Sequence, residues 1–296
     1  MYIDVFYSAL SVRGEIMEFQ AEIIRAIQSV ASPALDVIFQ CITVMGEELF
    51  LLPVAVLLFW CVNKELGYWI CWCAAEGNLL VNSVKGIFKV ERPIGYDGIR
   101  TLRAKTATGY SFPSGHTQAC ANLFTALAKA VNRKRFWILA FVLPLLVGIS
   151  RMYLGCHWPM DVAVSYVMGI CLPLILWLFY RKFAHRKALL FLISAVVFAP
   201  FCFMQGDIGD FWKSFGFAIG ISAGAFIETK FINFSVEGTF RQKALRFAIG
   251  LVFIILVYIL PKLLLPANNL VAFCRYFIIP IAAMDIWPAI FKKIGI

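Results

Sequence analysis

Charged residues are scarce in this sequence, and their scarcity excludes a soluble globular protein. Only 15% of the 296 residues are charged, whereas 61% are hydrophobic and the mean hydropathy is +0.82. Soluble domains carry about 25% charged residues and are far less hydrophobic. The composition therefore predicts a polytopic membrane protein.

Acidic residues are especially few, with 17 against 27 basic residues and a net charge of +10. A net charge of this sign can indicate a nucleic-acid partner. Here the basic residues occur in short runs between apolar stretches, which is typical of the cytoplasmic loops of membrane proteins. We therefore expect the lipid bilayer, and no nucleic acid, as their partner.

Signals for disulfides, structural zinc and secretion are missing as well. The nine cysteines are odd in number and lie mostly in apolar runs, which favours core residues over a disulfide framework. Cys71 and Cys73 do not have the spacing of zinc ligands. The N-terminus has no basic region followed by an apolar core and a cleavage site, so we expect no removable signal peptide.

Long apolar runs, by contrast, are abundant. A membrane-spanning helix needs about 20 apolar residues. The expected spans cover residues 46–62, 66–89, 115–131, 135–152, 158–181, 187–204, 211–228, 244–265 and 269–291. They predict an all-α fold, a polytopic membrane helical bundle, with an accessory helical part after about residue 185. Residues 1–32 alternate apolar and charged positions at helical spacing, which favours an amphipathic helix along the membrane surface. The pattern of residues 33–45 predicts a second helix, which ends at Gly46.

The basic loops predict how the chain is oriented. Runs of Lys and Arg at 133–135, 181–187, 241–246 and 292–293 fall on one side of the expected spans. The positive-inside rule then places the C-terminus in the cytoplasm. The loop 90–114 and the turn 151–157 share the opposite, outward face.

Three short segments near that face hold the residue types of a catalytic site, including two of the three histidines in the chain. They are Lys85 with Arg92-Pro93, then Pro113-Ser114-Gly115-His116, and finally Ser150-Arg151 with His157 and Asp161. Lys85 and Arg92 are two helical turns apart, so on a continuing helix, which Pro93 would stop, they share one face. Two cations at the end of a spanning helix need an anion.

The other two segments supply an anion site and a nucleophile. Ser114 and Gly115 precede an apolar helical run, so their N–H groups would be the free donors of a helix N-terminus, and Gly115 permits close approach. His157 and Asp161 are four residues apart, and the carboxylate can hold one ring proton while the other ring nitrogen stays free to attack. Together with Arg151, the residues of the three segments fit phosphoryl transfer. We expect no metal at the site, because the cations would repel a divalent ion.

These segments resemble the three-part signature of the type 2 phosphatidic acid phosphatase superfamily, over about residues 34–182. The resemblance implies a six-helix phosphatase core, here residues 33–185, between the interfacial helix of residues 1–32 and about three accessory transmembrane helices in residues 186–296. It also implies a phosphohistidine intermediate and no cofactor.

The resemblance further implies a role for each residue of the signature. His157 would be the nucleophile, Asp161 its orienting partner and His116 the acid that protonates the leaving group. The phosphoryl group would be bound by Lys85, Arg92, Ser114, Gly115 and Arg151.

The expected function is hydrolysis of a membrane lipid phosphate at the outer face of a bacterial cytoplasmic membrane. Polyprenyl (undecaprenyl) diphosphate is the first expectation, and phosphatidylglycerophosphate or phosphatidic acid the next. A sphingoid-base or sugar phosphate phosphatase, a phosphotransferase, and a non-catalytic lipid-phosphate binder or transporter remain alternatives. Arg100, Arg103 and Lys105 in the outer loop are candidates for headgroup contacts or for a solvated surface. The sequence leaves a homodimer open.

Overall fold

The computed structural model describes residues 2–104, 107–203 and 209–296, and every regular element in these ranges is a helix. The longer helices are α1 (Tyr2–Gln28), α2 (Pro33–Thr43), α3 (Glu48–Leu57), α4 (Lys64–Phe88), α5 (Gly115–Val131), α6 (Lys134–Tyr153), α7 (Pro159–Phe183), α8 (Lys187–Val197), α9 (Gly209–Ile227), α10 (Phe240–Leu264), α11 (Asn269–Ile281) and α12 (Trp287–Ile294). Short 3-10 or π-helical segments cover Val44–Gly46, Leu58–Val62, Ala184–Arg186, Ala199–Phe203, Glu228–Ile232 and Ala282–Ile286. The predicted all-α membrane bundle is confirmed.

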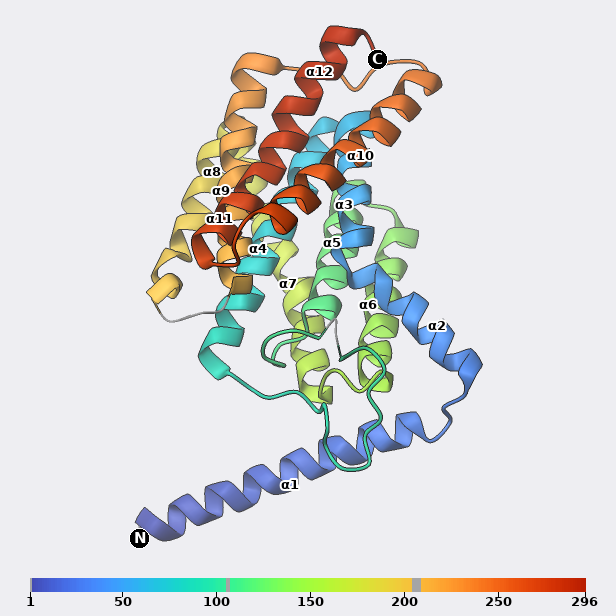
Figure 1. Cartoon of the computed structure of the whole chain (residues 1–296), viewed down its shortest axis with the longest axis vertical. Helices are drawn as coiled ribbons and strands as arrows, with labels where there is room; N and C mark the ends of the chain where they lie inside the picture. Colours follow the sequence, from blue (N-terminus) through green and yellow to red (C-terminus); the bar gives the residue numbers. More distant parts are fainter. Residues whose placement is uncertain (1, 105–106, 204–208) are drawn as a thin grey trace.

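Helices α4 to α7 run side by side, and α5 lies against the other three (Figure 1). The close approach of α5 and α7 depends on Gly169, because a Cβ atom there would lie 2.5 Å from the Cβ of Ala121 and 2.7 Å from the carbonyl oxygen of Gln118. This packing brings the starts of α5 and α7 together at one end of the bundle.

The C-terminal helices pack on the same bundle through α9, which contacts α4, α8 and α11. Small residues four apart on α9 form the seam with α11. Cβ atoms on Gly216 and Gly220 would lie 2.3 and 2.4 Å from the carbonyl oxygens of Phe273 and Phe277. Small residues at this spacing let membrane helices approach until their backbones touch.

Five helical stretches are long and apolar enough to cross a membrane among the described residues, which is fewer than the nine spans expected. They are Lys134–Tyr153, Pro159–Phe203, Gly209–Ile232, Phe240–Leu264 and Asn269–Ile294. The stretch Pro159–Phe203 covers most of two expected spans, 158–181 and 187–204. Helices α4 and α5 are not among these five stretches, because α5 has only 17 residues and α4 carries polar residues, several of which the bundle buries.

The N-terminal helices α1 and α2 meet at a bend of 116°, and together they could form a sixth span. In Figure 1, α1 extends across the end of the bundle that carries the loop after α4, and the C-terminus lies at the opposite end. Arg25 and Gln28 of α1 donate hydrogen bonds to the carbonyl oxygens of Asp97 and Arg100 in that loop. A position of α1 on the membrane surface stays a prediction, whereas the helix after Pro33 ends close to Gly46, as expected.

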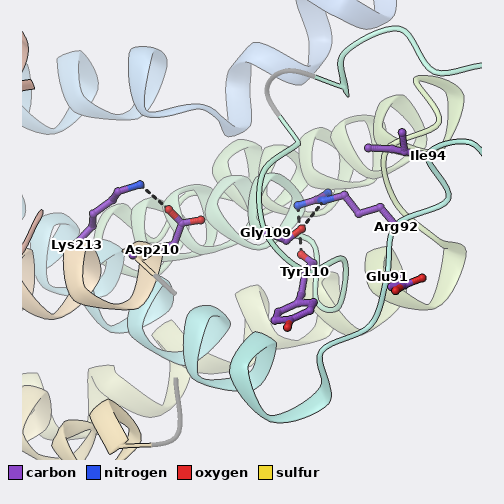
Figure 2. Close-up of a pocket in the computed structure, with 8 residues that line it drawn as sticks. Glu91, Arg92, Ile94, Gly109, Tyr110, Asp210 and Lys213 are labelled. Atoms are coloured by element: carbon purple, nitrogen blue, oxygen red, sulfur yellow. Dashed lines mark hydrogen bonds and ion pairs between the residues drawn. The ribbon is translucent and has the colours of Figure 1, made fainter. Parts of the chain in front are cut away.

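A cavity of about 620 Å³ lies where the start of α9 meets the loop after α4 (Figure 2). Arg92, Gly109 and Tyr110 line it from the loop, and Asp210 and Lys213 line it from α9. The C-terminal helices therefore contribute side chains to a space beside Arg92, in the first of the three segments predicted to form the site.

Candidate active site

Lys85 lies in the last turn of α4, with its side chain buried and its ammonium group donating to the carbonyl oxygen of Tyr110. The helix ends at Phe88, and Lys89 closes it in the left-handed conformation. Arg92 therefore lies in the loop and not on a continuing helix with Lys85, which corrects the sequence-based expectation. The two cations still converge, because Arg92 Nη2 also donates to the carbonyl oxygen of Tyr110, at 3.2 Å.

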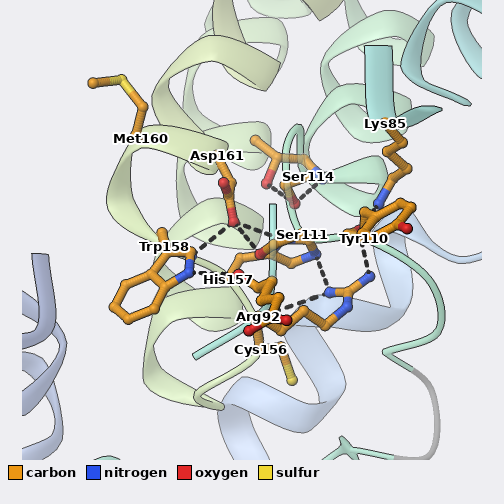
Figure 3. A network of polar contacts seen from close by, with 12 residues as sticks. Lys85, Arg92, Tyr110, Ser111, Ser114, Cys156, His157, Trp158, Met160 and Asp161 are labelled. Atoms are coloured by element: carbon orange, nitrogen blue, oxygen red, sulfur yellow. Dashed lines mark hydrogen bonds and ion pairs between the residues drawn. The ribbon is translucent and has the colours of Figure 1, made fainter. Parts of the chain in front are cut away.

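The guanidinium of Arg92 joins the loop to the third catalytic segment (Figure 3). Its Nε and Nη2 donate to the carbonyl oxygens of Gly109 (2.9 Å) and Thr108 (2.6 Å). Its Nη1 lies 3.0 Å from the carbonyl oxygen of Cys156 and 2.9 Å from Nε2 of His157. These contacts fix the loop beside the histidine.

The ring of His157 is buried and held between two partners (Figure 3). Because the guanidinium of Arg92 can only donate, Nε2 of His157 must be the acceptor, and the ring proton is on Nδ1. Nδ1 lies 3.1 Å from Oδ2 of Asp161, which therefore accepts that proton. The same oxygen accepts from the hydroxyl of Ser111 and, at 2.9 Å, from the backbone N–H of Trp158. The carboxylate thus sets the ring so that the lone pair of Nε2 faces Arg92.

The second segment forms the start of α5, as predicted. Ser114 is the N-cap, and its hydroxyl accepts from the backbone N–H of Thr117 at 3.5 Å. The N–H of Ser114 donates to the carbonyl oxygen of Asp161, at 3.3 Å. A Cβ atom on Gly115 would have no other atom within 4 Å. The open helix N-terminus is therefore held next to the start of α7.

Arg151, at the end of α6, is completely buried. Its Nη1 donates to the hydroxyl of Thr43 at 3.1 Å, while Nε and Nη2 have no hydrogen-bond partner among the described residues. Its carbonyl oxygen accepts from the N–H of Cys156, so the chain turns directly from Arg151 to His157. A buried guanidinium with free donors is costly unless an anion binds there.

His116, in the first turn of α5, pairs with an acidic residue from another helix. Nε2 of His116 lies 3.6 Å from Oε1 of Glu47, too far for a hydrogen bond but close enough for an ionic interaction. The backbones meet at Gly46, where a Cβ atom would lie 2.5 Å from the carbonyl oxygen of His116. The glycine thus allows Glu47 to face the second histidine.

Two of the three candidate headgroup residues, Arg100 and Arg103, pair with acidic side chains. Arg100 forms a bidentate pair with Asp36, at 2.7 and 2.9 Å. Arg103 forms an ion pair with Glu47, at 3.0 Å. Lys105 lies outside the described residues. Headgroup binding by these residues stays a prediction.

Burial and positive charge lower the pKa of two groups in the loops of the site. Burial, followed by the charge of Arg151, lowers the pKa of Arg92 to about 10. Burial, followed by the charges of Arg92 and Arg151, holds the pKa of His157 well below its usual value. The imidazole is therefore neutral at pH 7 and keeps a lone pair on Nε2.

Positive charge dominates the cluster. Lys85, Arg92 and Arg151 surround His157, and Asp161 already accepts three hydrogen bonds. In the part of the chain that the structure describes, no group of three or more His, Cys, Asp or Glu side chains is placed to hold a metal ion. The arrangement can hold an anion against a nucleophilic nitrogen.

Three polar residues of the site were not anticipated from the sequence: Ser111, Glu47 and Thr43. Ser111 lies inside the loop that was expected to approach the site, so its place two residues before Pro113 was a usable signal. Thr43 is the last residue of α2 and Glu47 directly precedes α3, and nothing in their local pattern indicates their partners. Their roles depend on contacts between distant segments.

Comparisons with known proteins agree on one family. The family model described as "PAP2 superfamily" matches residues 66–185, which contain all three segments of the predicted site. A second model, described as "PAP2 superfamily phosphatase, transmembrane extension", matches residues 212–296. The second match covers most of the helices that follow the expected core.

Individual relatives match about half of the chain. An "Undecaprenyl-diphosphatase" of Sulfolobus acidocaldarius is 27% identical, over 51% of this chain and 73% of the relative. A "Phosphatidylglycerophosphatase B" of Bacillus subtilis is 29% identical, over 48% of this chain and 74% of the relative. The crystal structure of a PAP2-type phosphatidylglycerolphosphate phosphatase from Bacillus subtilis aligns with a TM-score of 0.50 and 27% identity, covering 57% of this chain and 87% of the other.

Proposed function

This chain belongs to the PAP2 superfamily, and we propose that it is an integral membrane phosphatase that hydrolyses a lipid phosphate or diphosphate through a phosphohistidine intermediate. The proposal is supported by the neutral, carboxylate-oriented His157 and by the three cations around it. His116 supplies a second titratable ring in the same cluster.

In the first step, Nε2 of His157 attacks the phosphorus atom. The N–P bond forms as the P–O bond to the lipid breaks, and His116 gives a proton to the departing oxygen. Nη1 of Arg92, which donates a hydrogen bond to Nε2 at 2.9 Å, moves onto a phosphoryl oxygen. Asp161 retains the Nδ1 proton and stabilises the positive charge that develops on the ring.

In the second step, water attacks the phosphorus atom of the phosphohistidine. His116 accepts a proton from that water, the P–N bond breaks, and inorganic phosphate leaves with Nε2 regenerated. Lys85, Arg92 and Arg151 stabilise the phosphoryl oxygens in both steps, so the charge that a metal supplies elsewhere comes from side chains.

The single observation that carries this proposal is Arg151. Two of its nitrogen donors are buried without a hydrogen-bond partner among the described residues, and the charge of this guanidinium acts on His157. A phosphoryl group bonded to Nε2 would offer these donors oxygen acceptors, and bidentate contacts of this kind are what a guanidinium forms best with phosphate.

The proposed substrate is a polyprenyl diphosphate, and phosphatidylglycerophosphate or phosphatidic acid is the next choice. Relatives named for undecaprenyl diphosphate and for phosphatidylglycerophosphate support this order. We also propose that the site faces the outer side of a bacterial cytoplasmic membrane. The basic runs near the C-terminus support it, because the site and the C-terminus lie at opposite ends of the bundle (Figure 1).

The test is phosphate release by the full chain purified in detergent, with a metal chelator present. The panel contains undecaprenyl diphosphate, phosphatidylglycerophosphate, phosphatidic acid, sphingosine phosphate and a sugar phosphate, with His157→Ala as the control. We expect rapid release from a lipid substrate by the native chain and none by the variant. Release only after a metal is added, or none from any substrate, would overturn the proposal. Transfer of the phosphoryl group to an added alcohol in place of water would indicate a phosphotransferase.

A further inference from the structure

The cavity of about 620 Å³ beside Arg92 is built from two distant parts of the chain (Figure 2). Arg92 and Tyr110 contribute from the catalytic loop, and Asp210 and Lys213 contribute from the first turns of α9, in the accessory half. His157 does not line this cavity, but Arg92 does, and its Nη1 lies 2.9 Å from Nε2 of His157. A substrate that extends from His157 past Arg92 into the cavity would therefore contact the accessory helices.

The start of α9 is anchored to the catalytic core. Asn82, one turn before Lys85 on α4, donates to the hydroxyl of Ser214 at 2.7 Å and to the carbonyl oxygen of Asp210 at 3.3 Å. The hydroxyl of Ser214 donates to that same carbonyl oxygen at 2.9 Å. These bonds keep the first turn of α9 beside the end of α4.

The catalytic loop approaches this turn directly. Oδ2 of Asp210 lies 3.6 Å from the place a Cβ atom would take on Gly109, the residue whose carbonyl oxygen accepts from Arg92. Asp210 is also near enough to interact electrostatically with both Lys85 and Arg92. The charge of Asp210, on the accessory helix α9, thus contributes to the electrostatic field around Lys85 and Arg92.

Within the cavity, Nζ of Lys213 lies 2.6 Å from Oδ1 of Asp210. The two side chains are 37% and 35% exposed. An ion pair as exposed as this contributes little to stability, so another anion can take the place of the carboxylate at small cost. Of the two, Lys213 alone can attract a phosphate, while Asp210 repels it.

We propose that Lys213 is a specificity-determining residue, which leaves Asp210 and binds a second phosphate group of the substrate, on the leaving-group side of the bond that is cleaved. This inference rests on the proposed function and adds the substrate class: lipids that carry two phosphates, as diphosphates and phosphatidylglycerophosphate do. It also gives the accessory half a direct role in recognition.

The test compares Lys213→Ala with Lys262→Ala in the full chain. Lys262, in the last turn of α10, is exposed and does not line the cavity, so it is the matched control. We expect Lys213→Ala to raise KM for undecaprenyl diphosphate about tenfold, the scale of one charge-assisted hydrogen bond, and KM for phosphatidic acid by a much smaller factor. Lys262→Ala is expected to match the native chain on both substrates.

A second variant tests the same inference in the opposite direction. Asp210→Asn removes the competing carboxylate and frees Lys213, so KM for two-phosphate lipids should fall while KM for phosphatidic acid changes less. KM for phosphatidylglycerophosphate, whose two phosphates are separated by glycerol, shows whether Lys213 binds any second phosphate or only one that is joined directly to the first. Equal changes for one- and two-phosphate lipids in both variants would overturn the inference and leave the proposed function intact. Lack of phosphate release by the native chain would instead refute the proposed function.

Discussion

At the scale of single residues, the site gives its two histidines different positions and therefore different expected roles. His157 has its lone pair on Nε2 and its proton held by Asp161, which suits a nucleophile. His116 faces Glu47 and has no comparable hydrogen bond, which suits a group that gives and takes a proton. The two roles predict different responses to the leaving group.

We expect His157→Ala to be inactive on every substrate, because the variant lacks the Nε2 atom that attacks phosphorus in the proposed mechanism. His116→Ala should lose about 10²–10⁴-fold on lipid phosphates, the usual contribution of a general acid, and much less on a nitrophenyl phosphate, whose leaving oxygen needs no proton. Initial rates on both substrates measure this difference. Equal residual activity in the two variants would contradict the assigned roles.

The pH dependence tests the electrostatic link between Arg92 and His157. The pKa of His157 lies below its usual value first because of burial and then because of the positive charge of Arg92. Protonation inactivates the nucleophile, so the acid limb of kcat/KM that belongs to His157 should lie below pH 6.5. In Arg92→Gln, one positive charge is lost, the pKa rises, and the limb should move to higher pH.

Arg92→Lys is the control, because it retains the charge and alters the hydrogen bonds. Its acid limb should stay close to that of the native chain even if the overall rate falls. The ionisation of the substrate phosphate is common to all three proteins and cancels in the comparison. A limb at the same pH in the Gln and Lys variants would rule out the electrostatic link.

At the scale of helices, the starts of elements were predictable, but the place of a loop residue was not. Ser114 caps α5, as the sequence indicates, and Pro159 occupies the first position of α7, because capping and proline effects act within a few residues. Arg92 was placed on a continuing helix, yet α4 ends at Phe88. Its actual position depends on hydrogen bonds to the carbonyl oxygens of Thr108 to Tyr110, and no local sequence pattern predicts these contacts.

The seam between α9 and α11 predicts that one added methyl group is destabilising. Ala at position 220 would place a Cβ atom 2.4 Å from the carbonyl oxygen of Phe277, so the two helices must separate. We expect Gly220→Ala to lower the free energy of unfolding by about 1–3 kcal/mol, the usual cost of overpacking. Gly14→Ala on α1 meets no atom within 4 Å and should be neutral or slightly stabilising. Thermal unfolding in detergent measures both, and equal midpoints would contradict this account of the seam.

At the scale of the whole molecule, the catalytic half and the accessory half are joined at both ends of α4. Near the site, Asn82 holds the start of α9. At the other end, Lys64 donates to the buried carboxylate of Glu228 at 3.0 Å, and the hydroxyl of Tyr68 donates to the same group. The sequence predicts both halves, but it could not show that they meet at these points, since each contact joins residues far apart in the chain.

The ion pair between Lys64 and the buried Glu228 leads to the last prediction. Glu228 also accepts from the backbone N–H of Phe234 at 3.1 Å, so its carboxylate holds together α4, the end of α9 and the loop that follows. In Glu228→Gln the amide cannot neutralise Lys64, whose side chain is only 20% exposed. Since removal of one partner from a buried pair leaves an uncompensated charge, we expect the free energy of unfolding to fall by about 3 kcal/mol.

Glu237→Gln, at an exposed site in the same loop, is the control and should unfold like the native chain. Because the pair lies at the end of α4 away from the catalytic cluster, phosphate release below the unfolding transition should persist in Glu228→Gln. An unfolding midpoint equal to that of Glu237→Gln would show that the junction does not depend on this ion pair.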